Sequence, residues 1–175
     1  VLNESANTYY SRARGNYRAC AGSGDLYGNI PAGAPTGYIS GIGVFGVRQG
    51  QVFGGGGQSV LYCTIGQITD GTSNTVAFSE GFKDCIDVWS TINDVTLGNM
   101  GGTFYSHFNT PNSTVADRPW GPCPVPQGDR GYKGPCTSLG GPNRPPGNHN
   151  NNQRTAHAAA GSFHPSGVNV SFSDG

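Results

Sequence analysis

The side chains of this chain that could take part in catalysis or metal binding are few, and four histidines come first among them. They are His107, His149, His157 and His164. No pair has the close helical spacing of a zinc protease motif such as H-E-x-x-H. His149 and His157 share a polar, Asn-rich stretch, which suits a metal site and a solvated loop equally well. An isolated histidine is more often a hydrogen-bonded structural residue, so we predict no catalytic histidine.

Nucleophile and phosphate-binding motifs are also missing. A nucleophilic serine on a strained turn is typically presented by G-x-S-x-G, which the chain lacks. The glycine run at 54–57 is not followed by the Lys-Ser or Lys-Thr pair of a phosphate loop. We interpret this run as a turn and predict that the protein is not an enzyme.

Oxygen ligands for calcium are the strongest chemical candidates. Asp70 and Asn74 lie close together in the sequence, and Asp174 could add a further oxygen donor. Calcium accepts carboxylate and main-chain oxygens, but the Asp-x-Asp-x-Asp-Gly pattern of a dedicated loop is missing. A turn at Asp70-Gly71 is therefore the favoured interpretation. A structural calcium ion is the only cofactor that the sequence leaves open.

His164 and Asp174 frame the closing stretch of the chain and raise the question of a reacting pair. Ten residues of extended chain span about 33 Å, so the two side chains do not meet unless the chain folds back at Pro165-Ser166-Gly167. We predict structural roles instead: His164 fixes the turn that enters a strand, and Asp174-Gly175 forms the turn that leaves it. On this hypothesis His164→Ala impairs folding or assembly.

The five cysteines are scattered and contain no C-x-x-C pair, so they lack the usual zinc signature. Cys123 and Cys136 bracket a Pro/Gly-rich stretch that a disulfide would hold together, and we favour this pair. The other candidates for disulfides are Cys20, Cys63 and Cys85. An odd count leaves one thiol free or joined to another chain.

An extracellular or cell-surface location fits the composition. Lys and Glu are rare, Asn, Ser, Thr and Gly are abundant, and disulfides persist outside the cell. Three positions fit the Asn-x-Ser/Thr pattern and are glycosylation candidates: Asn3, Asn112 and Asn169. We therefore predict a secreted protein that would be a glycoprotein in a glycosylating host.

The composition also excludes several classes. Charged residues make up only 11% of the chain and the net charge is zero, which argues against nucleic acid as a partner. No apolar run approaches the length of a membrane span. Thirty glycines and twelve prolines indicate many turns, while eighteen aromatic residues distinguish the chain from a disordered one.

The elements that must position these residues read as short strands. Residues 59–68 suit a buried strand, residues 76–79 alternate as a half-buried strand, and residues 168–172 place Val168, Val170 and Phe172 on one face. Further strands are expected near 84–92 and 101–109, and a short helix at 4–14. Residues 111–152 show no period and read as a long loop region. We predict a single domain over 1–175, mainly β (β-dominated α+β), with a loop-rich antiparallel sheet.

Three segments resemble a known family. Residues 68–80, ITDGTSNTVAFSE, are similar to its internal I-x-D-G-T-S-N-T motif. Residues 164–175, HPSGVNVSFSDG, are similar to its closing H-x9-DG motif, and Asn16-Tyr17 begins a third similar segment. This is the large paralogous family of prepilin-type proteins with an H-x9-DG C-terminal domain, abundant in planctomycete-like bacteria.

The resemblance implies a type IV pilin-like or pseudopilin-like exported protein with an outward-facing globular β domain. Its motif positions here are Asp70, Gly71, Asn74, Glu80, His164, Gly167, Asp174 and Gly175. The family's apolar N-terminal helix is not in this chain, nor is the strand that usually follows Asp-Gly. We expect a structural subunit of an extracellular filament whose partners are copies of itself or other pilin-like subunits.

An alternative hypothesis is a secreted carbohydrate- or surface-binding module that uses Trp89, Trp120 and tyrosines on loops. The observation that separates the two is whether these aromatic rings are exposed and coplanar or packed in the core.

Overall fold

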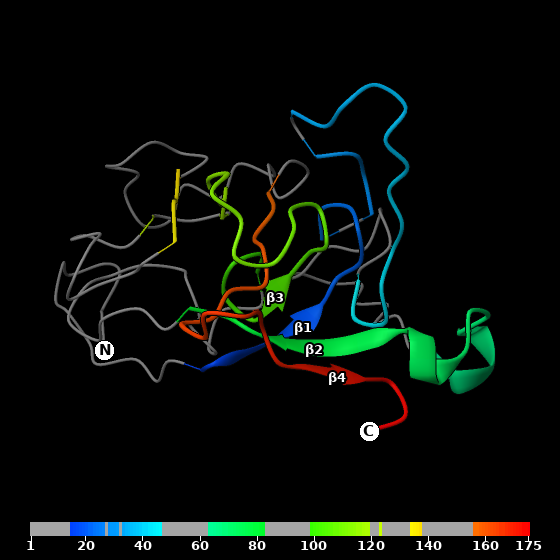
Figure 1. Cartoon of the computed structure of the whole chain (residues 1–175). Coiled ribbons are helices and arrows are strands. Elements are labelled where there is room, and N and C mark those ends of the chain that lie inside the picture. The colour runs from blue at the N-terminus through cyan, green and yellow to red at the C-terminus, as the bar shows by residue number, and fades with distance from the viewer. Residues whose placement is uncertain are drawn as a thin grey trace, which may run out of the picture.

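The computed structural model describes residues 15–26, 28–31, 33–46, 63–82, 99–119, 123, 134–137 and 156–175. These residues form one four-stranded sheet with the order β3-β1-β2-β4 (Figure 1). The strands are β1 (Tyr17–Cys20), β2 (Val76–Glu80), β3 (Phe104–Tyr105) and β4 (Val170–Phe172), and the 3-10 helices η1 (Ile65–Gln67) and η2 (Thr72–Asn74) precede β2. The predicted β-dominated class is confirmed. Nothing in this part of the chain is a helix that could span a membrane.

The sheet is mixed, although the sequence predicted an antiparallel one. β1 pairs with β2, and β2 with β4, in antiparallel fashion. β1 and β3 run parallel, with Ala19 opposite Phe104. A parallel neighbour needs a long crossover connection, which the chain between β1 and β3 supplies. Local periodicity carries no information about such a distant pairing.

The alternation expected in β2 is present, and its small residues are the ones that face the interior. Ala77 and Ser79 are buried, whereas Phe78 is partly exposed and lies against Phe45, with ring centroids 4.9 Å apart. A bulge interrupts the register with β4 between Val76 and Phe78. The strand is therefore half-buried, as predicted, and its large aromatic side chain lies on the outer face.

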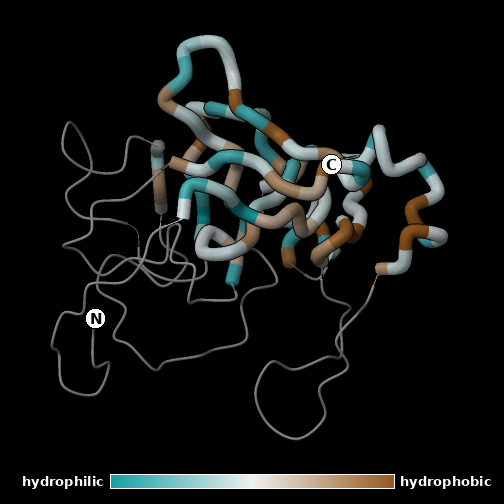
Figure 2. The backbone as a smooth tube through the Cα atoms, turned by 90° about the horizontal axis from the view of Figure 1, so that it is seen from below, coloured by the Kyte–Doolittle hydropathy of each residue, from teal (hydrophilic) through white to brown (hydrophobic). Residues whose placement is uncertain are grey.

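The core is built from small side chains contributed by segments far apart in the sequence. Residues 156–161 are buried. Ala156 and Ala158 pack with Leu26 and Met100, and Ala160 packs with Cys20 and Tyr105. Figure 2 shows the hydrophobic residues as short, separate stretches along the described chain. Arg18 is also buried, and its Nη1 donates to the Ala159 carbonyl at 3.3 Å. No sequence period pointed to residues 156–161, because alanine carries little hydrophobic signal.

The buried strand predicted at 59–68 is wrong over its described part. Residues 63–68 contain η1, and Ile65 is 76% exposed. Thr64 and Gln67 explain the difference, because the Thr64 N–H donates to Gln67 Oε1 at 2.8 Å and the Gln67 N–H to the Thr64 carbonyl at 2.9 Å. These local bonds satisfy the first turn of a helix and compete with strand pairing.

Other expectations lie partly or wholly outside the described residues. The helix at 4–14, the strand near 84–92, Asn3, Cys85, His149, Trp89 and Trp120 fall there. Within the predicted loop region, the described residues 111–119, 123 and 134–137 contain isolated bridges but no strand or helix. The expected strand at 101–109 is present only as the two residues of β3.

Gly161 should not tolerate a side chain. A Cβ at this position would lie 2.4 Å from Cδ2 of Phe82, whose ring also packs edge-on against Phe163. Gly161→Ala is therefore expected to lower the free energy of unfolding by about 2 kcal/mol, because the ring must leave its packed position. Urea unfolding measures the loss. Gly66→Ala is the matched control, since nothing lies within 4 Å of its Cβ position, and an equal loss there would contradict the explanation.

Candidate functional site

The three sequence motifs meet in adjacent strands. In chain order, the first motif, which begins at Asn16, contributes β1. The second, residues 68–80, contributes η2 and β2, and the third, residues 164–175, contributes β4. The main-chain N–H of Gly81 donates to the carbonyl of Asn16 at 2.8 Å, which joins the start of the first motif to the end of the second. Four side chains, Ser73, Glu80, Asn169 and Asp174, connect the second motif to the third, and we call them the motif clasp.

Glu80 forms one end of the motif clasp. Its Oε2 accepts the main-chain N–H of Asn169 at 2.9 Å, and its Oε1 accepts Asn169 Nδ2 at 3.0 Å. The Nε2 of His164 lies 3.5 Å from Oε1. These contacts lower the pKa of the Glu80 carboxyl, with the Asn169 N–H as the largest cause. The carboxylate is thus used to hold the third motif against β2.

Asp174 forms the other end. The hydroxyl of Ser73 donates to Asp174 Oδ2 at 2.5 Å. The main-chain N–H of Ser173 donates to the carbonyls of Thr72 and Thr75 at 3.1 and 2.9 Å. Gly175 follows with φ at 111°, in the region that favours glycine. Asp174-Gly175 therefore lies where β4 ends and contacts η2.

The calcium candidates take part in this same turn. Asn74 Nδ2 donates to the Asp70 carbonyl at 3.0 Å, and Thr75 Oγ1 donates to the Gly71 carbonyl at 3.0 Å. Gly71 has a φ of 87°. Among the described residues, no group of three or more His, Cys, Asp or Glu side chains is placed to hold a metal ion. The turn is organised by its own hydrogen bonds.

Two glycosylation candidates are bonded through their side chains. Asn112, in the left-handed region with φ at 55°, accepts the Ser162 N–H through Oδ1 at 2.8 Å and donates to the Gly167 carbonyl at 3.4 Å. Asn169 donates through Nδ2 to Glu80. A glycan is attached at Nδ2, the atom that donates both of these bonds. Asn112 and Asn169 thus have structural roles that the sequence pattern did not reveal.

The histidines do not form a common site. His157 is buried, exchanges main-chain hydrogen bonds with Arg118, and places its ring 4.7 Å from that of Phe108. His107 contacts the Tyr105 hydroxyl through Nε2 at 3.3 Å, and partial burial lowers the pKa of its imidazole. His164 lies beside Glu80 of the motif clasp. His107 and His157 therefore both contact residues of the segment 105–108, whereas His164 lies at the motif clasp.

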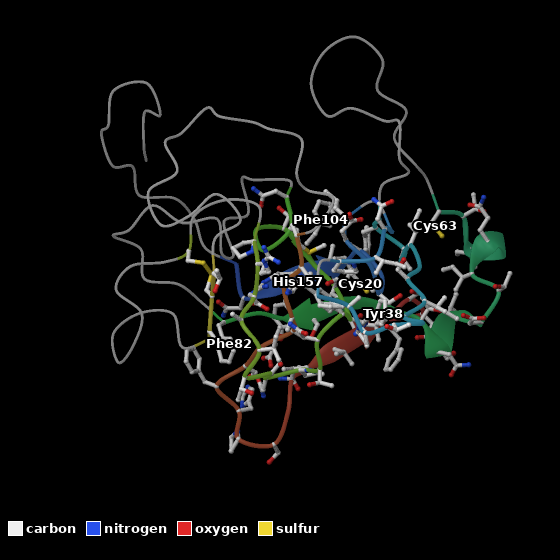
Figure 3. The ribbon with its side chains drawn as sticks, turned by 90° about the horizontal axis from the view of Figure 1, so that it is seen from above. Cys20, Tyr38, Cys63, Phe82, Phe104 and His157 are labelled. Atoms are coloured by element: carbon white, nitrogen blue, oxygen red, sulfur yellow. A yellow bond between two sulfur atoms is a disulfide. The ribbon has the colours of Figure 1, made fainter. Side chains whose placement is uncertain are left out.

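The favoured disulfide between Cys123 and Cys136 is present, with the Cα atoms 5.8 Å apart. Cys20 is a free thiol, and its burial raises the pKa of the thiol. Cys63 is free and exposed, and lies on the side of the described structure opposite to the disulfide (Figure 3).

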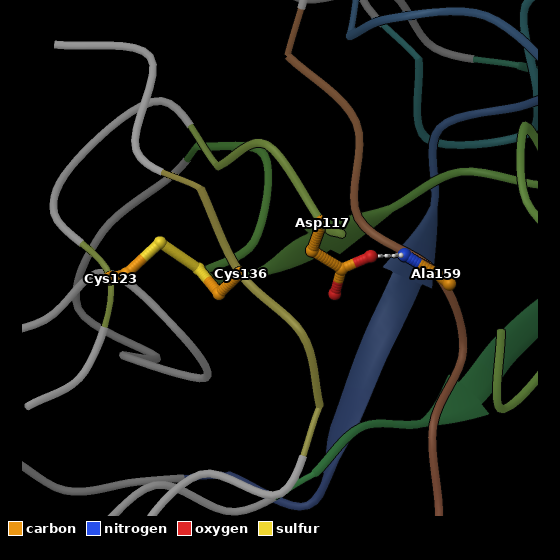
Figure 4. Close-up of a disulfide and its surroundings, with 4 residues drawn as sticks. All are labelled: Asp117, Cys123, Cys136 and Ala159. Atoms are coloured by element: carbon orange, nitrogen blue, oxygen red, sulfur yellow. Dashed lines mark hydrogen bonds between the residues drawn. A yellow bond between two sulfur atoms is a disulfide. The ribbon is translucent and has the colours of Figure 1, made fainter. Parts of the chain in front are cut away.

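Asp117 is a central residue that the sequence did not single out. It is buried, and its Oδ1 accepts the main-chain N–H of Ala159 at 2.7 Å (Figure 4). Its main chain bonds the segment that carries the disulfide, with Pro135 as acceptor at 2.9 Å and Thr137 as donor at 2.8 Å. No local pattern marks it, because its partners lie far away in the sequence. Asp117 joins the disulfide segment to the buried residues 156–161.

A small cavity beside Asp117 does not provide a substrate site. It is lined by Phe82, Asp117, Pro135 and Ala159, among others, and its interior is about 10 Å³. That volume accommodates roughly one water molecule. The cavity is therefore too small for a substrate, and no residue of the motif clasp lines it.

His164→Ala should reduce stability only slightly. The imidazole is 65% exposed and makes one 3.5 Å contact with Glu80, and exposed ion pairs contribute about 1 kcal/mol or less. The exposure of His164 therefore changes the expectation from the sequence that this substitution impairs folding, and we expect a folded variant with nearly unchanged urea unfolding at neutral pH. A loss of several kcal/mol in the free energy of unfolding would contradict this account. A variant that folds and assembles but has lost an enzymatic activity would instead contradict the structural role of His164.

The lowered pKa of Glu80 predicts a pH dependence. A carboxyl whose pKa falls below its ordinary value of 4.5 on folding stabilises the folded state above that pH. This contribution is lost as the pH falls through the lowered value. Glu80→Gln should therefore cost stability at neutral pH and cost less in acid, where the carboxylate of the unmodified chain is protonated. Urea midpoints of both proteins between pH 7 and pH 2.5 test this, and a constant difference would refute it.

Comparison with known proteins identifies a family. A family model described as "Protein of unknown function (DUF1559)" matches residues 3–175. No curated protein and no solved structure matches the chain.

Proposed function

For this chain, which belongs to the DUF1559 family of proteins of unknown function, we propose a role as a structural subunit of an extracellular, pilin-like filament or surface assembly. It acts by self-association, with copies of itself or other pilin-like subunits as partners. The observation that carries this proposal is the sheet edge formed by β4, which has no strand beyond it among the described residues.

The edge has the properties of a protein contact. Val170 and Phe172 are 41% and 39% exposed, and Tyr17 and Phe78 add exposed apolar surface on the neighbouring strands. An edge strand presents unpaired N–H and C=O groups that can pair with a strand from another chain. Strand addition of this kind gives affinity through main-chain bonds and specificity through alternate side chains.

The motif residues support a structural role more than a chemical one. Glu80 of β2 bonds to Asn169 just before β4, and Ser73 of η2 bonds to Asp174 just after it. Asn112 bonds the loop before β4. Motifs whose polar groups bond to one another in this way determine how the segments of the fold are arranged. In this arrangement β4 lies at the edge of the sheet.

An extracellular location is part of the proposal. The Cys123–Cys136 disulfide supports it, because such bonds persist in oxidising compartments. The low proportion of charged residues also favours close packing of copies over repulsion between them.

The carbohydrate-binding alternative gains less support from the described aromatic residues. Tyr38 packs edge-on against Phe108 at an interplanar angle of 80°, and its hydroxyl donates to the Ser23 carbonyl at 2.5 Å. Tyr105 is buried. Flat, parallel rings would be needed for stacking on a sugar, and these rings do not provide them.

The test is assembly of the purified protein, followed by electron microscopy and sedimentation velocity over a range of concentrations. Val170→Lys should reduce assembly, because a charge on an edge strand opposes pairing. Val115→Lys is the matched control, since Val115 is 57% exposed and lies outside the sheet. Monodisperse monomers of the unmodified chain under all conditions would overturn the proposal. Equal effects of the two lysine substitutions on assembly would show that the β4 edge is not the contact.

A further inference from the structure

We propose that copies of this protein associate by extending residues 163–167 and exchanging the segment that follows, 168–175, so that β4 of one chain pairs with β2 of another. This inference rests on the self-association proposed above. It places the contact between chains at the β2–β4 pairing, in place of strand addition at the outer edge of β4. The partner is a second copy of the same chain, and the contact surface is the outer edge of β2 together with Ser73 and Glu80.

The receiving side is formed without residues 162–175. β2 is held along its other edge by β1, with Tyr17 opposite Glu80 and Ala19 opposite Phe78. The turn that presents Ser73 is closed by its own bonds, from Asn74 to the Asp70 carbonyl and from Thr75 to the Gly71 carbonyl. A chain with β4 displaced would therefore keep an ordered edge with unpaired main-chain groups, which favours the return of a strand.

The donated side is held mainly by polar, exposed contacts. β4 has only three residues, and Val170 and Phe172 are partly exposed. Val168 packs against the buried group of Cys20, Tyr105 and Ala160, and Phe163 packs against Phe82 while remaining largely exposed. Because little apolar surface is buried, release costs much less than removal of a core strand.

The point at which the chain would open is defined by the structure. Residues 156–160 are buried and held by main-chain hydrogen bonds. His157 pairs with Arg118. The carbonyl of Ala158 accepts the Ser106 N–H, and the carbonyl of Ala160 accepts the Asn112 N–H. Residues 163–166 are exposed, and Gly167 has a φ of 151°. These five residues, 163–167, span about 16 Å when extended, so they can carry β4 away from its own β2.

The partner is a copy because β4 finds in a second chain the same acceptors and donors that it leaves in its own. The bonds from Asn169 to Glu80 and from Ser73 to Asp174 fix the segment at both ends, so a copy enters with the same register. Exchange of an identical element between protomers is a low-cost route to association. When the rotation between copies does not close, the same exchange extends into a filament.

Cysteines placed on the two strands distinguish exchange from surface contact. Val76 and Phe172 are opposite each other across β2 and β4, so Val76→Cys and Phe172→Cys are made separately, each with Cys63→Ser to remove the exposed thiol. The two proteins are mixed, assembled, oxidised and separated under denaturing, non-reducing conditions. Exchange predicts a covalent dimer containing one chain of each kind. A mixture of Val115→Cys with Phe172→Cys is the control and should give none.

The outcomes separate the two proposals. The control for bond formation is a single chain that carries both Val76→Cys and Phe172→Cys, which should form the disulfide within that chain. With this control satisfied, assemblies without the mixed dimer would overturn the exchange and leave self-association standing. Failure of the unmodified chain to assemble would overturn both.

A second measurement needs no substitution. A synthetic peptide of residues 162–175, added in excess, should occupy the edge of β2 and suppress assembly of the unmodified chain. A scrambled peptide should have no effect, and equal assembly with both peptides would count against the exchange.

Discussion

Replacement of both Cys123 and Cys136 by serine is expected to lower the free energy of unfolding by about 3 kcal/mol. The two residues are 13 apart in sequence, and the crosslink limits the conformations of the unfolded chain by an amount set by the length of that loop. In the folded chain the Cys136 segment is also bonded to Asp117, through Pro135 and Thr137. The loss should therefore include some loosening of the folded state.

The measurement is urea unfolding of the double serine variant under non-oxidising conditions. Cys63→Ser is the matched control, because this thiol is free and exposed, and its replacement should change stability by less than about 0.5 kcal/mol. Reduction of the unmodified protein should reproduce the loss. An unchanged midpoint in the double variant would mean that the disulfide contributes nothing to the folded state.

Asp117→Ala is the second large loss, also about 3 kcal/mol. The substitution leaves the buried main-chain N–H of Ala159 without its carboxylate acceptor. Loss of a partner destabilises the folded state more when the remaining group is buried than when it is exposed to water, and more when the lost partner is charged. It also removes volume beside Phe82, Pro135 and Ala159, where a small cavity already exists. Residues 156–161 should lose protection from hydrogen exchange as a result.

Asp117→Asn tests the cause of that loss. The asparagine keeps an oxygen that can accept the Ala159 N–H and has nearly the same volume, so this variant should lose clearly less than Asp117→Ala. Hydrogen exchange of the Ala159 amide reports the bond itself. Equal losses in the two variants would show that the negative charge, and not the hydrogen bond, is what the position requires.

The two predictions are coupled. Asp117 bonds the disulfide segment through its main chain and residues 156–161 through its side chain, so the two sites share one set of contacts. Residues in one hydrogen-bond network usually show non-additive effects. We expect the combined loss of Asp117→Ala and the double serine variant to be smaller than the sum of the separate losses.

The sequence by itself determined the features that neighbouring residues control. Alternation predicted β2 and the end of the chain at β4, and the Asp-Gly pair marked the turn that Asn74 closes by bonding the Asp70 carbonyl. The spacing of Cys123 and Cys136 around a Pro/Gly-rich stretch was enough to select the disulfide. In each case the deciding interactions lie within about a dozen residues of one another.

Local chemistry also misled where two local signals competed. The apolar run at 59–68 favoured a buried strand, but the reciprocal bonds of Thr64 and Gln67 favour a helical turn in residues 63–68. An apolar side chain is stabilised by burial, but its hydrophobicity does not show whether another segment covers it. Ile65 remains exposed because no other described segment packs over it.

Tertiary structure alone decided which segments meet. Ser73 and Asp174 are 101 residues apart, Glu80 and Asn169 are 89 apart, and Arg18 and Ala159 are 141 apart. The parallel pairing of β1 with β3 and the burial of Asp117 depend on contacts of the same kind. Periodicity and turn preference describe only a short stretch of chain, whereas these bonds are set by the packing of the whole sheet against residues 156–161. For that reason the motifs were visible as patterns, and their contact with one another was not.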